Sequence, residues 1–170
     1  MQKLISTAVL GSTGYVGLEL VKILIRHPNI QIKFLGCENS PSKDIREFDQ
    51  NIVIDTLPKL DLNNNFDPKN YDLVFLSLPH GVSHKFVKNF NRKIKIIDLS
   101  ADFRLDSEKL YSKNYNNDHA CPELLNQFIY GLPEINKDVL NTNFDVAVPG
   151  CYPTSVLIPL IPLLKKNLIK

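Results

Sequence analysis

The chain has 170 residues, of which 44% are hydrophobic and 22% charged, with 20 basic and 18 acidic side chains. A net charge of +2 lacks the basic excess of a nucleic-acid-binding protein, and the composition is neither disordered nor collagen-like. No apolar run reaches the roughly 20 residues of a membrane-spanning helix, and the N-terminus lacks the apolar stretch of a secretory signal. Three cysteines without CxxC spacing argue against a disulfide framework. We therefore expect a cytoplasmic protein with no nucleic-acid or membrane partner.

Short apolar runs alternate with amphipathic stretches along the chain, which is the pattern of βαβ units. The expected strands are residues 7–10, 30–35, 71–78, 95–99 and 145–148. The expected helices are residues 14–26, 82–90, 134–140 and 156–166. Strands that alternate with helices predict an α/β fold, a doubly wound Rossmann-type parallel sheet with helices on both faces.

Two polar stretches fit this pattern less well. Residues 41–68 are rich in Asn and Lys, which we interpret as compositional rather than functional. Within them we expect only one weak strand, residues 52–56, and loop. Residues 105–123 are expected to be irregular, with Tyr111 and His119 in polar surroundings.

A glycine-rich segment, residues 11–17, follows the first expected strand and opens the first expected helix. Glycines in this context permit an unusual backbone turn, let a pyrophosphate approach the main chain and allow close helix–strand packing. The helix N-terminus also presents free N–H groups to phosphates. The GxxGxxG spacing differs from the commoner GxGxxG, and a tight turn without a ligand is the alternative. The residues predicted to bind a dinucleotide here are Gly11, Ser12, Thr13, Gly14, Tyr15, Val16 and Gly17.

The residues after the second expected strand leave two alternatives for the nucleotide. Glu38 lies about 20 residues past the glycines, where an acid binds the ribose 2′-hydroxyl and favours NAD. Ser40, Ser42 and Lys43 follow at once and could hold the 2′-phosphate of NADP. The residues alone do not decide between the two.

Cys151 lies between the last expected strand and the last expected helix, in Pro149-Gly150-Cys151-Tyr152-Pro153. Pro153 suits the first helical position, so Cys151 is expected at a helix N-terminus, where the dipole favours a thiolate. A thiolate beside a nicotinamide can attack an acyl group or an aldehyde and hold the carbon for hydride transfer. Cys37 and Cys121 are expected to be structural or incidental.

Two prolines, Pro159 and Pro162, lie inside the last helical pattern. An interior proline costs a helix roughly 3 kcal/mol because it removes a hydrogen bond and clashes with the preceding turn. We therefore expect a kink or an early break in this helix.

Five strings together resemble those of the N-acetyl-gamma-glutamyl-phosphate reductases, the acyl-phosphate reductases of arginine biosynthesis. They occur in the family's order across nearly the whole chain, which is more specific than any one of them. Aspartate-semialdehyde dehydrogenases share the glycine turn and a catalytic cysteine, but not the second and third strings. The strings are residues 11–17, Leu78-Pro79-His80-Gly81-Val82-Ser83, Asp98-Leu99-Ser100-Ala101-Asp102-Phe103-Arg104-Leu105, Tyr130-Gly131-Leu132-Pro133-Glu134 and residues 149–154.

The resemblance implies NADPH-dependent reduction of N-acetyl-L-glutamyl 5-phosphate, a small anionic substrate, to N-acetyl-L-glutamate 5-semialdehyde and phosphate. In this reaction Cys151 is the catalytic nucleophile and forms a thioester. Pro79 and His80 would line the nicotinamide side of the cofactor, and Ser40 and Lys43 would contact the NADP 2′-phosphate.

Arg104, near the end of the third string, is a candidate substrate-binding residue. Its planar guanidinium suits either a phosphate or a carboxylate. The alternative is a surface ion pair with Asp102 or Asp106.

Relatives in this family continue past the cysteine into a second domain, which supplies a histidine base and dimer contacts. We therefore expect residues 1–150 to form a dinucleotide-binding domain, and residues 151–170 to lead into a substrate domain that is missing here. This implies an inactive fragment whose full-length form is a homo-oligomer.

Two other interpretations stay open: a related acyl-phosphate reductase of the aspartate- or aminoadipate-semialdehyde type, or a dinucleotide-binding module without turnover. His27 and His84 lie on helical patterns and are expected to be exposed. No Cys/His spacing predicts a metal site.

Overall fold

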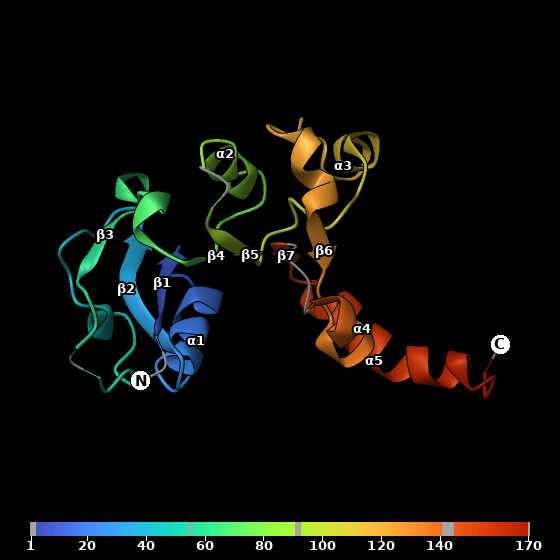
Figure 1. Cartoon of the computed structure of the whole chain (residues 1–170), viewed down its shortest axis with the longest axis horizontal. Coiled ribbons are helices and arrows are strands. Elements are labelled where there is room, and N and C mark those ends of the chain that lie inside the picture. The colour runs from blue at the N-terminus through green and yellow to red at the C-terminus, as the bar shows by residue number, and fades with distance from the viewer. Residues whose placement is uncertain (1–2, 55, 91–92, 141–144, 170) are drawn as a thin grey trace.

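The computed structural model describes residues 3–54, 56–90, 93–140 and 145–169. Within these residues it contains a seven-stranded sheet in the order β3-β2-β1-β4-β5-β7-β6 (Figure 1). Every pairing in the sheet is parallel, so the predicted doubly wound fold is confirmed. The strands are β1 Ile5–Leu10, β2 Ile30–Cys37, β3 Leu60–Leu62, β4 Leu73–Leu76, β5 Lys95–Asp98, β6 Phe128–Tyr130 and β7 Asp145–Ala147.

Helices connect these strands in the manner of βαβ units. The helices are α1 Tyr15–Leu24, α2 Ser83–Val87, α3 Glu108–Tyr115, α4 Pro133–Leu140 and α5 Cys151–Lys165. Short 3-10 turns are η1 Ile45–Glu47, η2 Asn63–Asn65, η3 Pro68–Asn70 and η4 Pro122–Gln127. Central strands of a parallel sheet are covered on both faces and therefore read as continuous apolar runs, which is why β1 and β4 could be identified from the sequence.

The core consists of two apolar clusters, each containing side chains from the sheet. One contains Leu10 of β1 and Val87 of α2. The other contains Val9 of β1 and Val21 of α1. Successive residues of β1 thus belong to opposite clusters, as the period of a strand requires.

β1 lies at the switch point of the sheet, because it pairs with β2 on one side and with β4 on the other. The chain leaves β1 at Gly11 and enters α1. Ligands of open α/β sheets bind outside the carboxyl ends of the strands at such a point, so the topology places the glycine segment where a site is expected.

Two local expectations are wrong, and one strand is not predicted. Residues 52–54 and 56 form no strand; Ile52 is buried in a loop, and the edge strand next to β2 is β3. Residue 55 lies outside the described residues. Strand β6 is not predicted, because its three residues carry almost no periodicity. The stretch expected to be irregular contains α3, which Ser107 caps by accepting from the N–H of Leu110 and in which Tyr111 is buried.

We expect a kink or an early break in the last helix, and the early break is wrong, because α5 runs through Pro159 and Pro162 to Lys165. None of its residues is buried, so backbone carbonyls that lose their helical partner can be hydrated instead of being buried unsatisfied. Figure 1 shows α5 extending away from the sheet. In the part of the chain that the structure describes, no helix is long and apolar enough to span a bilayer.

Candidate functional site

The glycine segment forms a tight turn in which two positions require glycine. Gly11 has a φ of +74°, and a Cβ there would collide with the carbonyl oxygen of Ser77. A Cβ on Gly17 would collide with the carbonyl oxygen of Gly11 and lie 2.8 Å from the Cα of Ser12. Gly14 differs, since its Cβ would meet only the Gly11 carbonyl oxygen, at 3.6 Å. The main chain at Gly14 is therefore open to a close ligand, which fits the approach of a pyrophosphate.

Side-chain and main-chain hydrogen bonds hold this turn against its neighbours. The N–H and the hydroxyl of Ser12 both donate to the carbonyl oxygen of Gly36, at 2.8 and 2.9 Å. The Oδ1 of Asn63 accepts from the N–H of Gly11 at 3.0 Å. The sequence does not point to Asn63, because its Asn-rich tract looks compositional and no local pattern distinguishes it from Asn64 and Asn65.

A cavity of about 620 Å³ opens over the turn. It is lined by Gly11, Thr13, Gly14, Tyr15, Val16, Glu38, Asn63, Ser77, Leu78, Pro79, His80 and Leu99. A neighbouring cavity of about 310 Å³ shares Glu38, Asn63, Leu78 and Pro79 with it.

Most of the predicted cofactor residues line the larger cavity, including Pro79 and His80. Ser12 and Gly17 lie beneath it and are buried. Ser40 and Lys43 are among the residues that the structure describes, but they line neither cavity.

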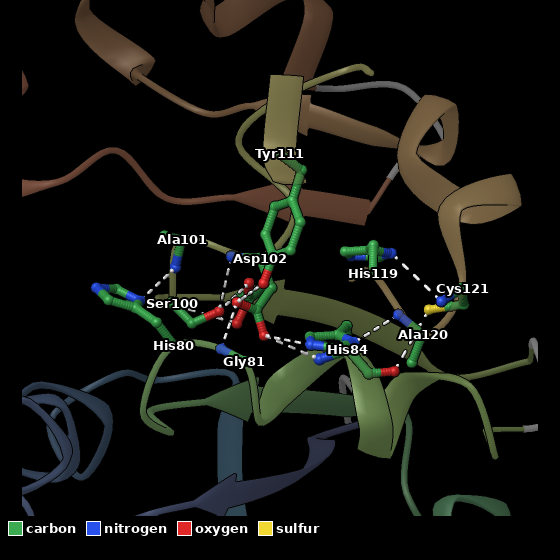
Figure 2. Close-up of polar contacts among 11 residues, drawn as sticks. His80, Gly81, His84, Ser100, Ala101, Asp102, Tyr111, His119, Ala120 and Cys121 are labelled. Carbon is green, nitrogen blue, oxygen red and sulfur yellow. Dashed lines mark hydrogen bonds and ion pairs between the residues drawn. The ribbon is translucent and has the colours of Figure 1, made fainter. Parts of the chain in front are cut away.

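The turn that carries Pro79 and His80 is held in place by hydrogen bonds to residues of the third sequence string (Figure 2). The N–H of Ala101 donates to Nδ1 of His80 at 2.9 Å, so the neutral imidazole holds its proton on Nε2. Gly81 has a φ of +77°, and its N–H donates to Oδ1 of Asp102 at 2.8 Å.

Asp102 is a buried carboxylate that accepts three hydrogen bonds. Besides Gly81, the N–H of His84 donates to Oδ2 at 3.1 Å and the hydroxyl of Tyr111 donates to Oδ1 at 3.0 Å. Its side chain is 0% exposed. Figure 2 shows it between α2, α3 and the Gly81 turn. A carboxylate accepts up to four hydrogen bonds, so its capacity is largely used.

His84 is buried, at 1% exposure, so the expectation of an exposed residue is wrong, whereas His27 is exposed as expected. The N–H of Ala120 donates to Nδ1 of His84 at 2.7 Å. The His84 ring stacks on the ring of His119, which is also buried. Burial lowers the pKa of both imidazoles, against the opposing charge of Asp102. The two rings are therefore neutral at pH 7.

A second buried carboxylate, Asp98, lies at the end of β5 and accepts from the N–H and the hydroxyl of Ser100 at 3.1 and 2.7 Å. Burial raises the pKa of Asp98 to about 6, although the Ser100 hydrogen bonds act in the opposite direction. The N–H of Asp102 in turn donates to Oγ of Ser100 at 3.1 Å. This short hydrogen-bonded chain orders the loop that leaves β5.

Cys151 is the first residue of α5, with Gly150 as the N-cap, so the predicted position at a helix N-terminus is confirmed. Pro153 is the third helical residue rather than the first, still within the turn whose N–H groups need no helical partner. Cys151 is exposed, whereas Cys37 and Cys121 are buried. The described chain thus presents one accessible thiol.

Arg104 connects the cavity to the cysteine loop. Its Nε donates to the carbonyl oxygen of Val148 at 2.8 Å, and its Nη2 donates to that of Leu99 at 2.9 Å. Leu99 lines the larger cavity, and Val148 precedes the cysteine loop. A Cβ on Gly150 would lie 3.0 Å from Nη1, so the guanidinium reaches the loop itself. Among the described residues, it forms no ion pair with Asp102 or Asp106.

Gly17→Ala is expected to destabilise the fold by about 2–3 kcal/mol, because the new methyl group overlaps main-chain atoms that cannot move without opening the turn. Urea denaturation measures the change. Gly14→Ala is the matched variant: its φ of −76° suits alanine, so we expect a change within about 1 kcal/mol.

The Gly14→Ala methyl group nevertheless projects from a residue that lines the cavity. We expect it to weaken dinucleotide binding about tenfold, equivalent to about 1.4 kcal/mol. Wild-type affinity in this variant would exclude close approach of the pyrophosphate to Gly14.

Comparison with known proteins gives a consistent family match. A family model described as the semialdehyde dehydrogenase NAD binding domain matches residues 6–143. The chain is 43% identical over 170 residues to the N-acetyl-gamma-glutamyl-phosphate reductase of Ehrlichia canis, and 39% identical over 166 residues to that of Acinetobacter baylyi. The alignments cover 98% and 96% of this chain but only 48% and 47% of those proteins. The chain thus spans about half the length of the curated relatives it matches, which carry the family name that the five strings indicated.

Solved structures with the same fold are aspartate semialdehyde dehydrogenases. The Candida albicans enzyme, solved with NADP, aligns with a TM-score of 0.65 at 18% identity, over 96% of this chain and 48% of that one. The Vibrio cholerae enzyme II aligns with a TM-score of 0.69 at 18% identity, over 96% and 47%. At this identity the likeness concerns the fold alone.

Proposed function

Because the chain belongs to the semialdehyde dehydrogenase NAD-binding domain family, we propose that it provides the dinucleotide-binding domain and the nucleophile of an N-acetyl-gamma-glutamyl-phosphate reductase. In this proposal residues 1–150 form the domain that binds a nicotinamide dinucleotide, and α5 carries the nucleophile. The reaction belongs to arginine biosynthesis, as the resemblance to this family implies.

The observation that carries the proposal is the exposed Cys151 thiol at the N-terminus of α5, connected through Arg104 to the wall of the glycine-lined cavity. The positive end of the helix dipole favours a thiolate at this position. The glycine turn offers main-chain N–H groups to a pyrophosphate. A nucleophile and a dinucleotide cavity are thus at the same edge of one sheet.

The chemistry divides into two steps. The Cys151 thiolate attacks the acyl carbon of N-acetyl-L-glutamyl 5-phosphate, and the C–O bond to phosphate breaks with its electron pair going to the leaving phosphate, so that a thioester forms. When bound, the reduced dinucleotide supplies the hydride for the second step; NADPH is the donor that the resemblance implies. Loss of the product aldehyde returns Cys151 to its thiolate.

Two groups of this chain would orient the reaction. His80 lines the cavity with its Nδ1 engaged by Ala101, so its Nε2–H is the available donor beside the nicotinamide. Arg104 uses two of its five N–H donors on main-chain carbonyls. Its Nη1, next to Gly150, is the atom we propose for contact with a substrate phosphate or carboxylate.

Acylation of Cys151 tests this function directly. It does not require the complete turnover that we expect these 170 residues to lack, because acylation needs only the thiolate and the acyl phosphate. The protein is mixed with N-acetyl-L-glutamyl 5-phosphate without dinucleotide, and intact-mass and peptide mass spectrometry locate any acyl group. We expect one N-acetylglutamyl group on Cys151, released by hydroxylamine as a thioester, and much slower reaction with aspartyl 4-phosphate. Labelling spread over other residues, or faster reaction with the aspartyl compound, would contradict the proposal.

A further inference from the structure

The end of the dinucleotide cavity that lies beside β2 contains one charged side chain. Glu38 directly follows β2 and lines both cavities. Its position relative to the phosphate turn is fixed, because Ser12 makes two hydrogen bonds to Gly36, two residues earlier. If a dinucleotide pyrophosphate binds at the glycine turn, the group that is joined to it on the β2 side therefore lies near Glu38.

The smaller cavity has the lining that an adenosine needs. Leu62, Val82 and Phe86 supply apolar surface, and Asn63 and Asn64 supply neutral polar groups. Glu38 lies between this lining and the glycine turn, since it is shared by both cavities. That is the place of the ribose between an adenine and a pyrophosphate.

No lysine or arginine is among the described residues that line either cavity. Lys43, the cation that could have paired with a 2′-phosphate, has its Nζ 6.0 Å from the centroid of the Phe48 ring. Ser40 and Ser42 also line neither cavity. A phosphate placed on the ribose would bring about two negative charges to a carboxylate, with no lining cation to compensate.

We infer that Glu38 makes this site select a dinucleotide without a 2′-phosphate, so that NADH is preferred over NADPH. A carboxylate accepts hydrogen bonds from ribose hydroxyls but repels a phosphate at the same place. The inference rests on the proposed dinucleotide binding and decides between the two alternatives that the sequence leaves open. It also departs from the NADPH that the family resemblance implies.

Calorimetric titration of the chain with NADH and with NADPH tests the inference without any need for turnover. We expect the Kd for NADH to be at least about tenfold lower than that for NADPH. Glu38→Gln removes the charge at nearly constant size, and is expected to weaken NADH and strengthen NADPH until the ratio is below about threefold. Glu108→Gln, an exposed acid in the first turn of α3, is the control and should keep the wild-type ratio.

The outcomes separate this inference from the function on which it rests. Tighter binding of NADPH by the wild-type chain, or an unchanged ratio in Glu38→Gln, would overturn the role of Glu38 while leaving dinucleotide binding intact. Binding of neither nucleotide would overturn both.

Discussion

Cys151→Ser is expected to slow acylation by N-acetyl-L-glutamyl 5-phosphate at least about 1,000-fold, because an alcohol at this position is almost wholly protonated and is a poor nucleophile. Phosphate release, measured over a single turnover, is the direct readout. The affinity for a dinucleotide should change less than about twofold, since Cys151 does not line the cavity. Loss of chemistry with retained binding is the signature of a nucleophile.

A double variant separates the position of the thiol from its mere exposure. Cys151→Ser combined with Ser155→Cys moves an exposed thiol four residues along α5, to the same side of the helix but away from its N-terminus. If acylation needs the helix N-terminus and the Arg104 contact, the double variant stays inactive. Recovery of acylation in it, or retention in Cys151→Ser, would remove Cys151 from the mechanism.

The parts of the site that could be predicted are those encoded within one short segment. The glycine turn needs only a strand, a spacing and a helix in sequence, and the structure places Gly11 and Gly17 where a side chain would collide with main chain. The position of Cys151 at the start of a helix is local in the same way, because Gly150 and the following apolar pattern define where the helix begins.

The parts that could not be predicted depend on contacts between distant segments. Asn63 accepts from Gly11, 52 residues away, and Asp102 accepts from Gly81, 21 residues away. Neither residue has a neighbour in sequence that reveals its partner. The nucleotide preference that we infer depends on the same kind of contact, since Glu38 and Lys43 lie five residues apart but only Glu38 lines the cavities. The side on which a loop residue faces is decided by tertiary packing.

Asp102→Asn is expected to destabilise the protein by about 3 kcal/mol, in the range found when one member of a buried polar network is removed. All three partners of Asp102 are donors, and an amide would place its own N–H₂ against at least one of them. For a chain of this length the loss corresponds to a decrease in Tm of roughly 6–12 °C, measured by calorimetry. Tyr111→Phe removes one donor and leaves none unpaired, so its cost should be smaller, about 1–2 kcal/mol.

The two Asp102 bonds to main-chain N–H groups also connect stability to binding, because they hold the turn that presents Pro79 and His80 to the cavity. Ile45→Ala is the matched control: Ile45 is buried in the other core cluster, and its truncation should cost a similar 2–5 kcal/mol. At a temperature where both variants are folded, we expect Asp102→Asn to weaken dinucleotide binding about tenfold and Ile45→Ala to leave it unchanged. Equal affinities in the two variants would make Asp102 a purely structural residue. Selective loss in Asp102→Asn would instead identify it as the residue that positions one wall of the cofactor site.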